Sequence, residues 1–121
     1  MKEYYRFIVG NQGIYEVVEK SCPKNDPRRV NKPDGSWLPK VGMKYPGAIS
    51  FWTEAGVKKY QQSGLMKWHS SVAQGKVEVI IIQEPKKVIY RDSNQIIIAQ
   101  EEVRIKKKQS LEEFLKSRKL I

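Results

Sequence analysis

Cysteine and histidine are nearly absent from this sequence, which has one residue of each among its 121. Cys22 has no second cysteine with which to form an internal disulfide. Together with His69 it is too small a set to supply the three or four ligands of a zinc site. The sequence therefore predicts neither a disulfide framework nor a metal centre.

Long apolar runs are also missing. The opening stretch MKEYYRFIVG has too short an apolar run for a signal peptide, and no segment reaches the roughly 20 apolar residues that cross a membrane. We therefore expect no membrane partner and a reducing, cytoplasmic location.

Acidic residues are scarce beside basic ones, since 13 Asp and Glu face 23 Lys and Arg for a net charge of +10. Residues 20–45 and residues 104–121 each hold seven Lys or Arg against two acidic residues, and these two segments account for the whole excess. Basic segments attract nucleic acid and phosphorylated ligands. They also serve solubility alone, and both interpretations stay open.

The residues that are present favour one folded domain. The 40% hydrophobic content, with three Trp, six Tyr and three Phe, is enough to build a compact core. Because 121 residues lie within the usual size of one domain, we expect a single domain over residues 1–121.

The first third of the chain predicts a strand, a helix and a loop. The stretch EYYRFIV, residues 3–9, is rich in β-forming residues. Ile14, Val17 and Val18 then follow at helical spacing. Residues 21–46 contain five prolines and no sustained period, which predicts a long basic loop that packs back on the body through its aromatic residues.

The rest of the chain alternates strands and helices. Residues 47–52 predict a strand, and Thr53 is suited to cap the helix that follows. Residues 65–72 predict a second helix, residues 76–85 a buried strand, and the stretch up to the final helix two or three short strands. Ser110 and Glu113 have capping-box spacing, which predicts a helix over residues 110–119. This order indicates an α+β fold with antiparallel strands.

Three motifs in this order resemble the ADP-ribosyltransferase superfamily in its small bacterial and phage forms. They are the strand that contains YR, the segment ISFWTEAGVKKY, and the late stretch SNQIIIAQEEVRI. The last two are also similar to poly(ADP-ribose) polymerases. The resemblance covers most of the chain outside residues 21–46. It implies a split antiparallel sheet with short helices, and NAD as the cofactor.

The resemblance also implies roles for particular residues. Arg6 would grip NAD through a phosphate or ribose, a task that suits the fork of donors on a guanidinium. Ser50 would brace the ribose on the nicotinamide side, with Thr53 as its helper. Trp52 lies two residues from Ser50 and so faces the same side of a strand. Tyr60 would stack on nicotinamide, although its helical spacing equally suits a core residue.

The last motif departs from the family pattern, because Gln95 stands where the family has its catalytic glutamate. An amide keeps the hydrogen bond to ribose but supplies no negative charge, so weak turnover, or binding without turnover, is expected. Asp92, Glu101 or Glu102 would be substitutes, but nothing in the sequence directs them to the site. His69 has the pKa of a general base, although a single histidine on a helix more often fills a surface or core position.

The sequence thus leaves three functional hypotheses. The first is an NAD-binding ADP-ribosyltransferase-like protein whose acceptor is a nucleic acid or a protein bound to one. The second is a basic nucleic-acid-binding module in which Trp37 or Tyr45 stacks on bases. The third is a catalytically inactive transferase-like domain that acts as a nucleotide sensor or an inhibitor. The candidate nucleic-acid contacts are Arg28, Arg29, Lys32, Lys106, Lys107 and Lys108.

Overall fold

The structure, a computed structural model, describes residues 2–118. The α-helices are α1 (Ile14–Ser21), α2 (Glu54–Gln62), α3 (Leu65–Val72) and α4 (Leu111–Ser117). The strands are β1 (Glu3–Val9), β2 (Gln12–Gly13), β3 (Ala48–Trp52), β4 (Val77–Gln83), β5 (Tyr90–Arg91), β6 (Gln95–Ala99) and β7 (Ile105–Ser110). The expected single α+β domain is confirmed, and β2 is a strand that the sequence did not predict.

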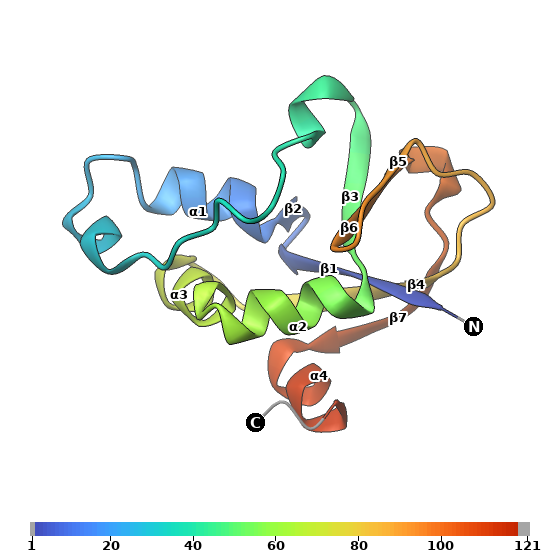
Figure 1. The fold of residues 1–121 in the computed structure, drawn as a ribbon. Helices are drawn as coiled ribbons and strands as arrows, with labels where there is room; N and C mark the ends of the chain where they lie inside the picture. The colour runs from blue at the N-terminus through green and yellow to red at the C-terminus, as the bar shows by residue number, and fades with distance from the viewer. Residues whose placement is uncertain (1, 119–121) are drawn as a thin grey trace.

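All strands belong to one antiparallel sheet of order β5-β6-β3-β1-β4-β7, with β2 paired to β1. Seven residue pairs join β1 to β4, and five join β3 to β6. A single pair, Tyr5 with Trp52, joins β1 to β3. Beyond it the two strands separate, and Figure 1 shows β3 and β6 at a steep angle to β1 and β4. The sheet is therefore narrowed to one pair between its two halves.

The core lies on both faces of this sheet. Each of the four helices contributes buried residues to the larger cluster, which includes Phe7 of β1 and Phe114 of α4. The smaller cluster lies between strands and centres on Tyr4, Phe51 and Ile96. Burying each large apolar side chain contributes roughly 1.5 to 3 kcal/mol, so these two clusters hold the halves of the sheet in place.

The long loop between α1 and β3 is ordered by its own side chains. It contains two short 3-10 helices, η1 (Pro27–Asn31) and η2 (Gly42–Lys44). The Arg29 guanidinium donates to the carbonyls of Cys22 and Pro23, while Asp26 accepts from the backbone and side chain of Arg28. The expectation that this loop packs on the body is correct, because Trp37 and Leu38 pack against the larger core cluster.

The predicted caps are present at two helices. Ser110 and Glu113 form the expected capping box at the start of α4. The helix ends at Ser117, Arg118 is its C-cap, and position 119 of the predicted helix lies outside the described residues. Within residues 2–118, no helix has the length and apolar character needed to cross a membrane.

Candidate active site

Arg6 lies where the two halves of the sheet separate. Its Nη1 donates to the carbonyl of Ser50 at 3.1 Å, in the place of a backbone donor from β1, and its Nη2 lies 3.7 Å from Glu16. Gly13 makes room for the guanidinium, since a Cβ at that position would lie 2.6 Å from Nη2. Burial lowers the pKa of Arg6, and Glu16 opposes this shift. The side chain keeps its charge, because arginine is not deprotonated in proteins.

Gln95 lies opposite Trp52 in the pairing of β3 with β6, so their side chains are neighbours on one face. The Gln95 Nε2 donates to Asp92 Oδ2 at 3.1 Å and to the carbonyl of Pro39 at 3.0 Å. With 7% of its surface exposed, Gln95 is held in a fixed orientation.

Asp92 is the carboxylate that the Gln95 position lacks. Besides Gln95 Nε2, it accepts from the Tyr90 hydroxyl at 2.8 Å and from the backbone N–H groups of Asn94 and Gln95. Burial alone would raise the pKa of Asp92, but these hydrogen bonds lower it overall, so the group is ionised near neutral pH. The sequence signal was present, because Asp at the start of the turn DSNQ folds back on the next residues as an Asx-turn.

Arg6, Ser50, Trp52, Asp92 and Gln95 are therefore linked by direct contacts or neighbouring positions. We call these five residues the junction cluster. They come from β1, β3, β6 and the turn before β6. Four of them were candidate site residues from the sequence, and Asp92 joins them in the structure.

Tyr60 lies beneath the junction cluster and not on its surface. Its ring stacks on Trp52 with centroids 4.7 Å apart, it is 0% exposed, and its hydroxyl lies 2.6 Å from His69 Nδ1. Burial, with smaller contributions from Lys32 and Arg29, lowers the pKa of His69 to about 4. His69 is therefore neutral and enclosed at pH 7, and Tyr60 supports the Trp52 ring from within the core.

Thr53 has a structural position beside the cluster. Its hydroxyl accepts from the Gly56 N–H, which caps α2, and donates to the carbonyl of Ser93 at 2.7 Å. Its own N–H donates to the Asn94 carbonyl. These bonds fix the turn that carries Asp92 against the start of α2.

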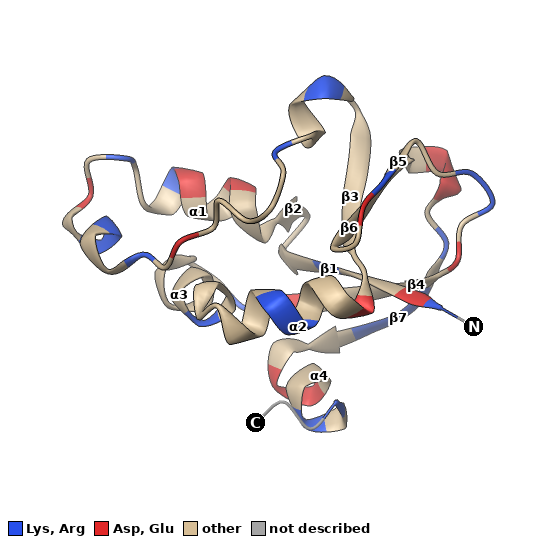
Figure 2. Ribbon diagram, viewed as in Figure 1, with Lys and Arg blue, Asp and Glu red and all other residues tan. Residues whose placement is uncertain are grey.

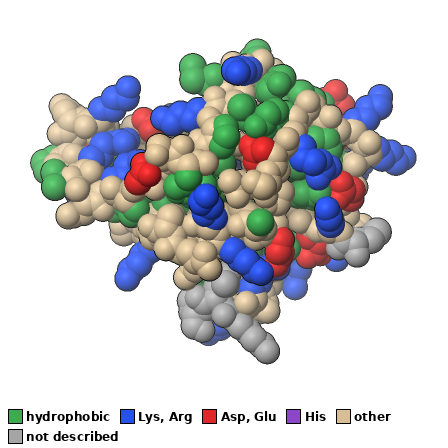
Figure 3. Space-filling model, viewed as in Figure 1, with side chains coloured by type: hydrophobic (Ala, Val, Ile, Leu, Met, Phe, Trp, Pro, Cys, Tyr) green, Lys and Arg blue, Asp and Glu red, His purple; other side chains and the backbone are tan. Residues whose placement is uncertain are grey.

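Residues 37–45, which we call the strap, cover the Trp52 and Gln95 side of the cluster. Trp37 lies 6.0 Å from Trp52 between ring centroids, and Tyr45 lies 6.3 Å from Tyr90. Figure 1 shows this part of the chain rising beside β3 into η2. In Figure 3, hydrophobic side chains gather between η2 and the β5–β6 hairpin, around a small acidic patch.

The candidate nucleic-acid contacts form two separate groups. Arg28 and Arg29 are used within the loop, with ion pairs to Asp26 and Glu19 respectively. On β7, an edge strand, Lys106 pairs with Glu3 and Lys108 with Glu78. Figure 2 places η1 and β7 at opposite sides of the molecule. The structure therefore does not bring these residues together with Lys32 and Lys107 into one surface.

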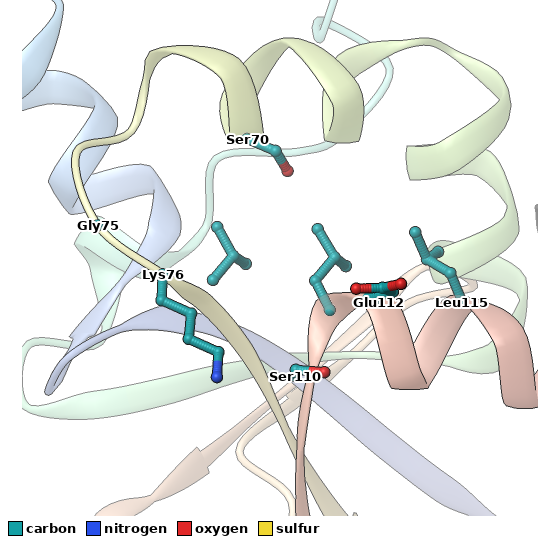
Figure 4. Close-up of a pocket in the computed structure, with 8 residues that line it drawn as sticks. Ser70, Gly75, Lys76, Ser110, Glu112 and Leu115 are labelled. Atoms are coloured by element: carbon teal, nitrogen blue, oxygen red, sulfur yellow. The ribbon is translucent and has the colours of Figure 1, made fainter.

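Two hollows lie outside the cluster. A groove of about 660 Å³ borders it through Thr53 and Asp92, and its other walls include Tyr4, Tyr5, Glu54 and Arg91. A second hollow of about 520 Å³ lies where α4 faces α3 (Figure 4), and none of the sequence-predicted site residues lines it. Ser70, Lys76 and Glu112 stand around it. The first groove alone adjoins the candidate chemistry.

Comparisons of the chain with models of protein families, with curated proteins and with solved structures found no match. Among residues 2–118 there is no group of three or more His, Cys, Asp and Glu side chains arranged to hold a metal ion. The candidate site consists of arginine, amide, carboxylate and aromatic groups.

Proposed function

We propose that this chain binds NAD at the junction cluster and transfers ADP-ribose from it to an acceptor, as an ADP-ribosyltransferase-like enzyme. One observation carries the proposal: Arg6, Ser50 and Gln95, which the resemblance marks as site residues, converge with an ionised Asp92 where the sheet narrows. The narrowed antiparallel sheet supports the same fold family. The acceptor in this proposal is a nucleic acid or a protein bound to one, in keeping with the net charge of +10.

Arg6 has donors to spare for a phosphate. Within residues 2–118 its guanidinium makes one hydrogen bond, to Ser50, and a longer ion pair with Glu16. The guanidinium is held at the base of the separation between strands, so a pyrophosphate could meet a positioned charge. A fixed guanidinium loses less conformational freedom on binding than a mobile one.

Asp92 and Gln95 divide the work that one glutamate does in the resembled family. NAD supplies the ADP-ribosyl group, and positive charge develops on its ribose as the bond to nicotinamide breaks and the bonding electrons leave with nicotinamide. The Gln95 amide is suited to orient a ribose hydroxyl, while the Asp92 carboxylate supplies negative charge 3.1 Å from that amide. A preorganised electrostatic group of this kind commonly changes a rate by about 100- to 1000-fold.

Calorimetric titration with NAD tests the binding half of the proposal. Arg6→Ala should weaken NAD binding about 10- to 100-fold, because a hydrogen bond to a charged group contributes about 1.5 to 3 kcal/mol. Arg6→Lys, which keeps the charge but loses the fork, should fall in between and guards against loss of fold.

Arg104→Ala is the matched control, since the Arg104 side chain donates to the carbonyls of Glu101 and Val103 away from the cluster. It should bind NAD as the wild type does. Equal affinity in wild type and Arg6→Ala, or no NAD binding by the folded wild type, would contradict the proposal. Salt-sensitive nucleic-acid binding that Arg28→Ala with Arg29→Ala weakens would then favour the basic binding module.

A further inference from the structure

We propose that the strap is a movable wall of the NAD site, and that Trp37 closes on an aromatic ring of the dinucleotide. This inference rests on the proposed function. It adds a specificity-determining residue, Trp37, and a step of opening and closing to the binding of NAD.

The strap is attached to the body by few contacts. The backbone hydrogen bonds recorded at and beside it are local, from Leu38 to Gly35, from Lys44 to Val41 and from Tyr45 to Gly42. Its cross-links to the sheet are the Gln95 amide and two pairs of aromatic rings. A segment without a strand-pairing ladder opens at a small fraction of the free energy of global unfolding. The strap therefore meets the first requirement of a movable wall.

The ring geometry around Trp52 suits a planar ligand. One neighbour, Tyr60, is closely stacked on it with 4.7 Å between centroids and 20° between planes. Trp37 is farther away, at 6.0 Å and 34°. A ring between two others needs about 7 Å between them, twice the optimal carbon–carbon contact distance. A shift of about 1 Å in the strap approaches that spacing.

The Trp37 ring is also held from outside the strap. Lys59 of α2 places its Nζ 5.1 Å from the ring centroid, a cation–π distance. The Trp37 Nε1 donates to the Asp34 carbonyl at 3.1 Å. These contacts orient the indole plane while leaving the strap backbone free of the sheet, which is the arrangement a hinged aromatic wall requires.

The strap closes the site in its present position. The Pro39 carbonyl accepts from the Gln95 Nε2 that the proposed chemistry assigns to a ribose oxygen. When the strap opens, Asp92 still holds the same amide. NAD entry therefore exchanges one acceptor on Gln95, the Pro39 carbonyl, for another on the ligand, and the strap then settles on the ligand ring.

Two readouts test the inference with the full chain. In NAD titrations, Trp37→Ala should weaken binding about 5- to 150-fold, the range for loss of one base-stacking aromatic ring, and Trp37→Phe should recover most of the affinity. In limited trypsin digestion without NAD, Trp37→Ala should speed cleavage after Lys40 and Lys44. Added NAD should slow this cleavage in the wild type.

Met43→Ala is the matched control, because this side chain lies on the same strap and is 90% exposed. It should change neither readout. If Arg6→Ala weakens NAD binding but Trp37→Ala changes neither affinity nor cleavage, the strap inference is wrong and the proposed function stands. If the folded wild type binds no NAD, both are overturned.

Discussion

At the scale of single residues, the site depends on how one guanidinium is placed. Arg6 meets the Ser50 carbonyl because β1 and β3 part after one residue pair, and Gly13 leaves the room for it. Gly13 has φ −63° and ψ 147°, a conformation that alanine adopts without strain. Its glycine is therefore required by the neighbouring guanidinium and not by the backbone.

Gly13→Ala is expected to displace Arg6 without removing it. The new Cβ would stand 2.6 Å from Nη2 and 3.1 Å from Cζ, and the flexible side chain would move away. NAD affinity should fall about 10-fold, one lost charge-assisted hydrogen bond, while the free energy of unfolding in urea changes by less than about 1 kcal/mol. Gly42→Ala, where nothing lies within 4 Å of the added Cβ, is the control. Unchanged NAD affinity in Gly13→Ala would show that the position of Arg6 is unimportant.

Two residues show what sequence could and could not predict about the site. Gln95 was identified by its place before an apolar run, and the structure puts it opposite Trp52. Asp92 was not assigned, because its role depends on a turn that returns its carboxylate to Gln95. Tyr60 was given a ligand contact by resemblance, but its helical spacing from Val57 equally fitted the buried position that it has.

At the scale of elements, the turn between β5 and β6 is fastened to the start of α2. Thr53 bonds the turn through its hydroxyl and its N–H. Gly56, in the first turn of the helix, allows the Asn94 carbonyl to come so close that an added Cβ would lie 2.0 Å from its oxygen. Because the same turn carries Asp92, the helix positions the carboxylate of the site.

Gly56→Ala is therefore expected to destabilise the protein and disturb the site together. The obstacle is backbone, which cannot move aside as a flexible side chain does, so we expect a loss of about 2 to 3 kcal/mol in the free energy of unfolding. Urea denaturation followed by tryptophan fluorescence measures it, and Ala55→Gly distinguishes a local helix effect from the clash. A loss no larger than that of Ala55→Gly would contradict the packing described here.

Most elements were predictable because their signals are local. Thr53 and Ser110 cap the helices that they were expected to cap, and the alternating apolar residues of β4 gave its position. The strand β2 was missed because a two-residue strand that ends in Gly13 carries no periodic pattern. The order of strands in the sheet was also out of reach, since it depends on contacts between distant parts of the chain.

At the scale of the whole molecule, the stability of the fold depends on a histidine held neutral in the core. The pKa of His69 is lowered from 6.5 to about 4 by burial, with Lys32 and Arg29 adding to the shift. Below pH 6.5 the unfolded chain binds a proton that the folded chain refuses until about pH 4. The free energy of unfolding must therefore fall as the pH drops through this interval.

The expected loss between pH 7 and pH 4 from this one group is on the order of 3 kcal/mol. His69→Gln keeps a hydrogen-bonding partner for Tyr60 but does not titrate, so its stability should depend less on pH over the same interval. Urea denaturation of both proteins at several pH values provides the comparison. Parallel pH profiles for wild type and His69→Gln would show that His69 is not the source.

The most direct test of the central claim is nicotinamide release from NAD, followed by NMR, with the wild type and Asp92→Asn in the presence of nucleic acid. We predict release by the wild type and a rate about 100- to 1000-fold lower in Asp92→Asn, because the amide keeps the shape of the site without its charge. Equal rates in the two proteins would contradict the role of Asp92. Binding of NAD without any release by the wild type would contradict turnover and leave a nucleotide sensor.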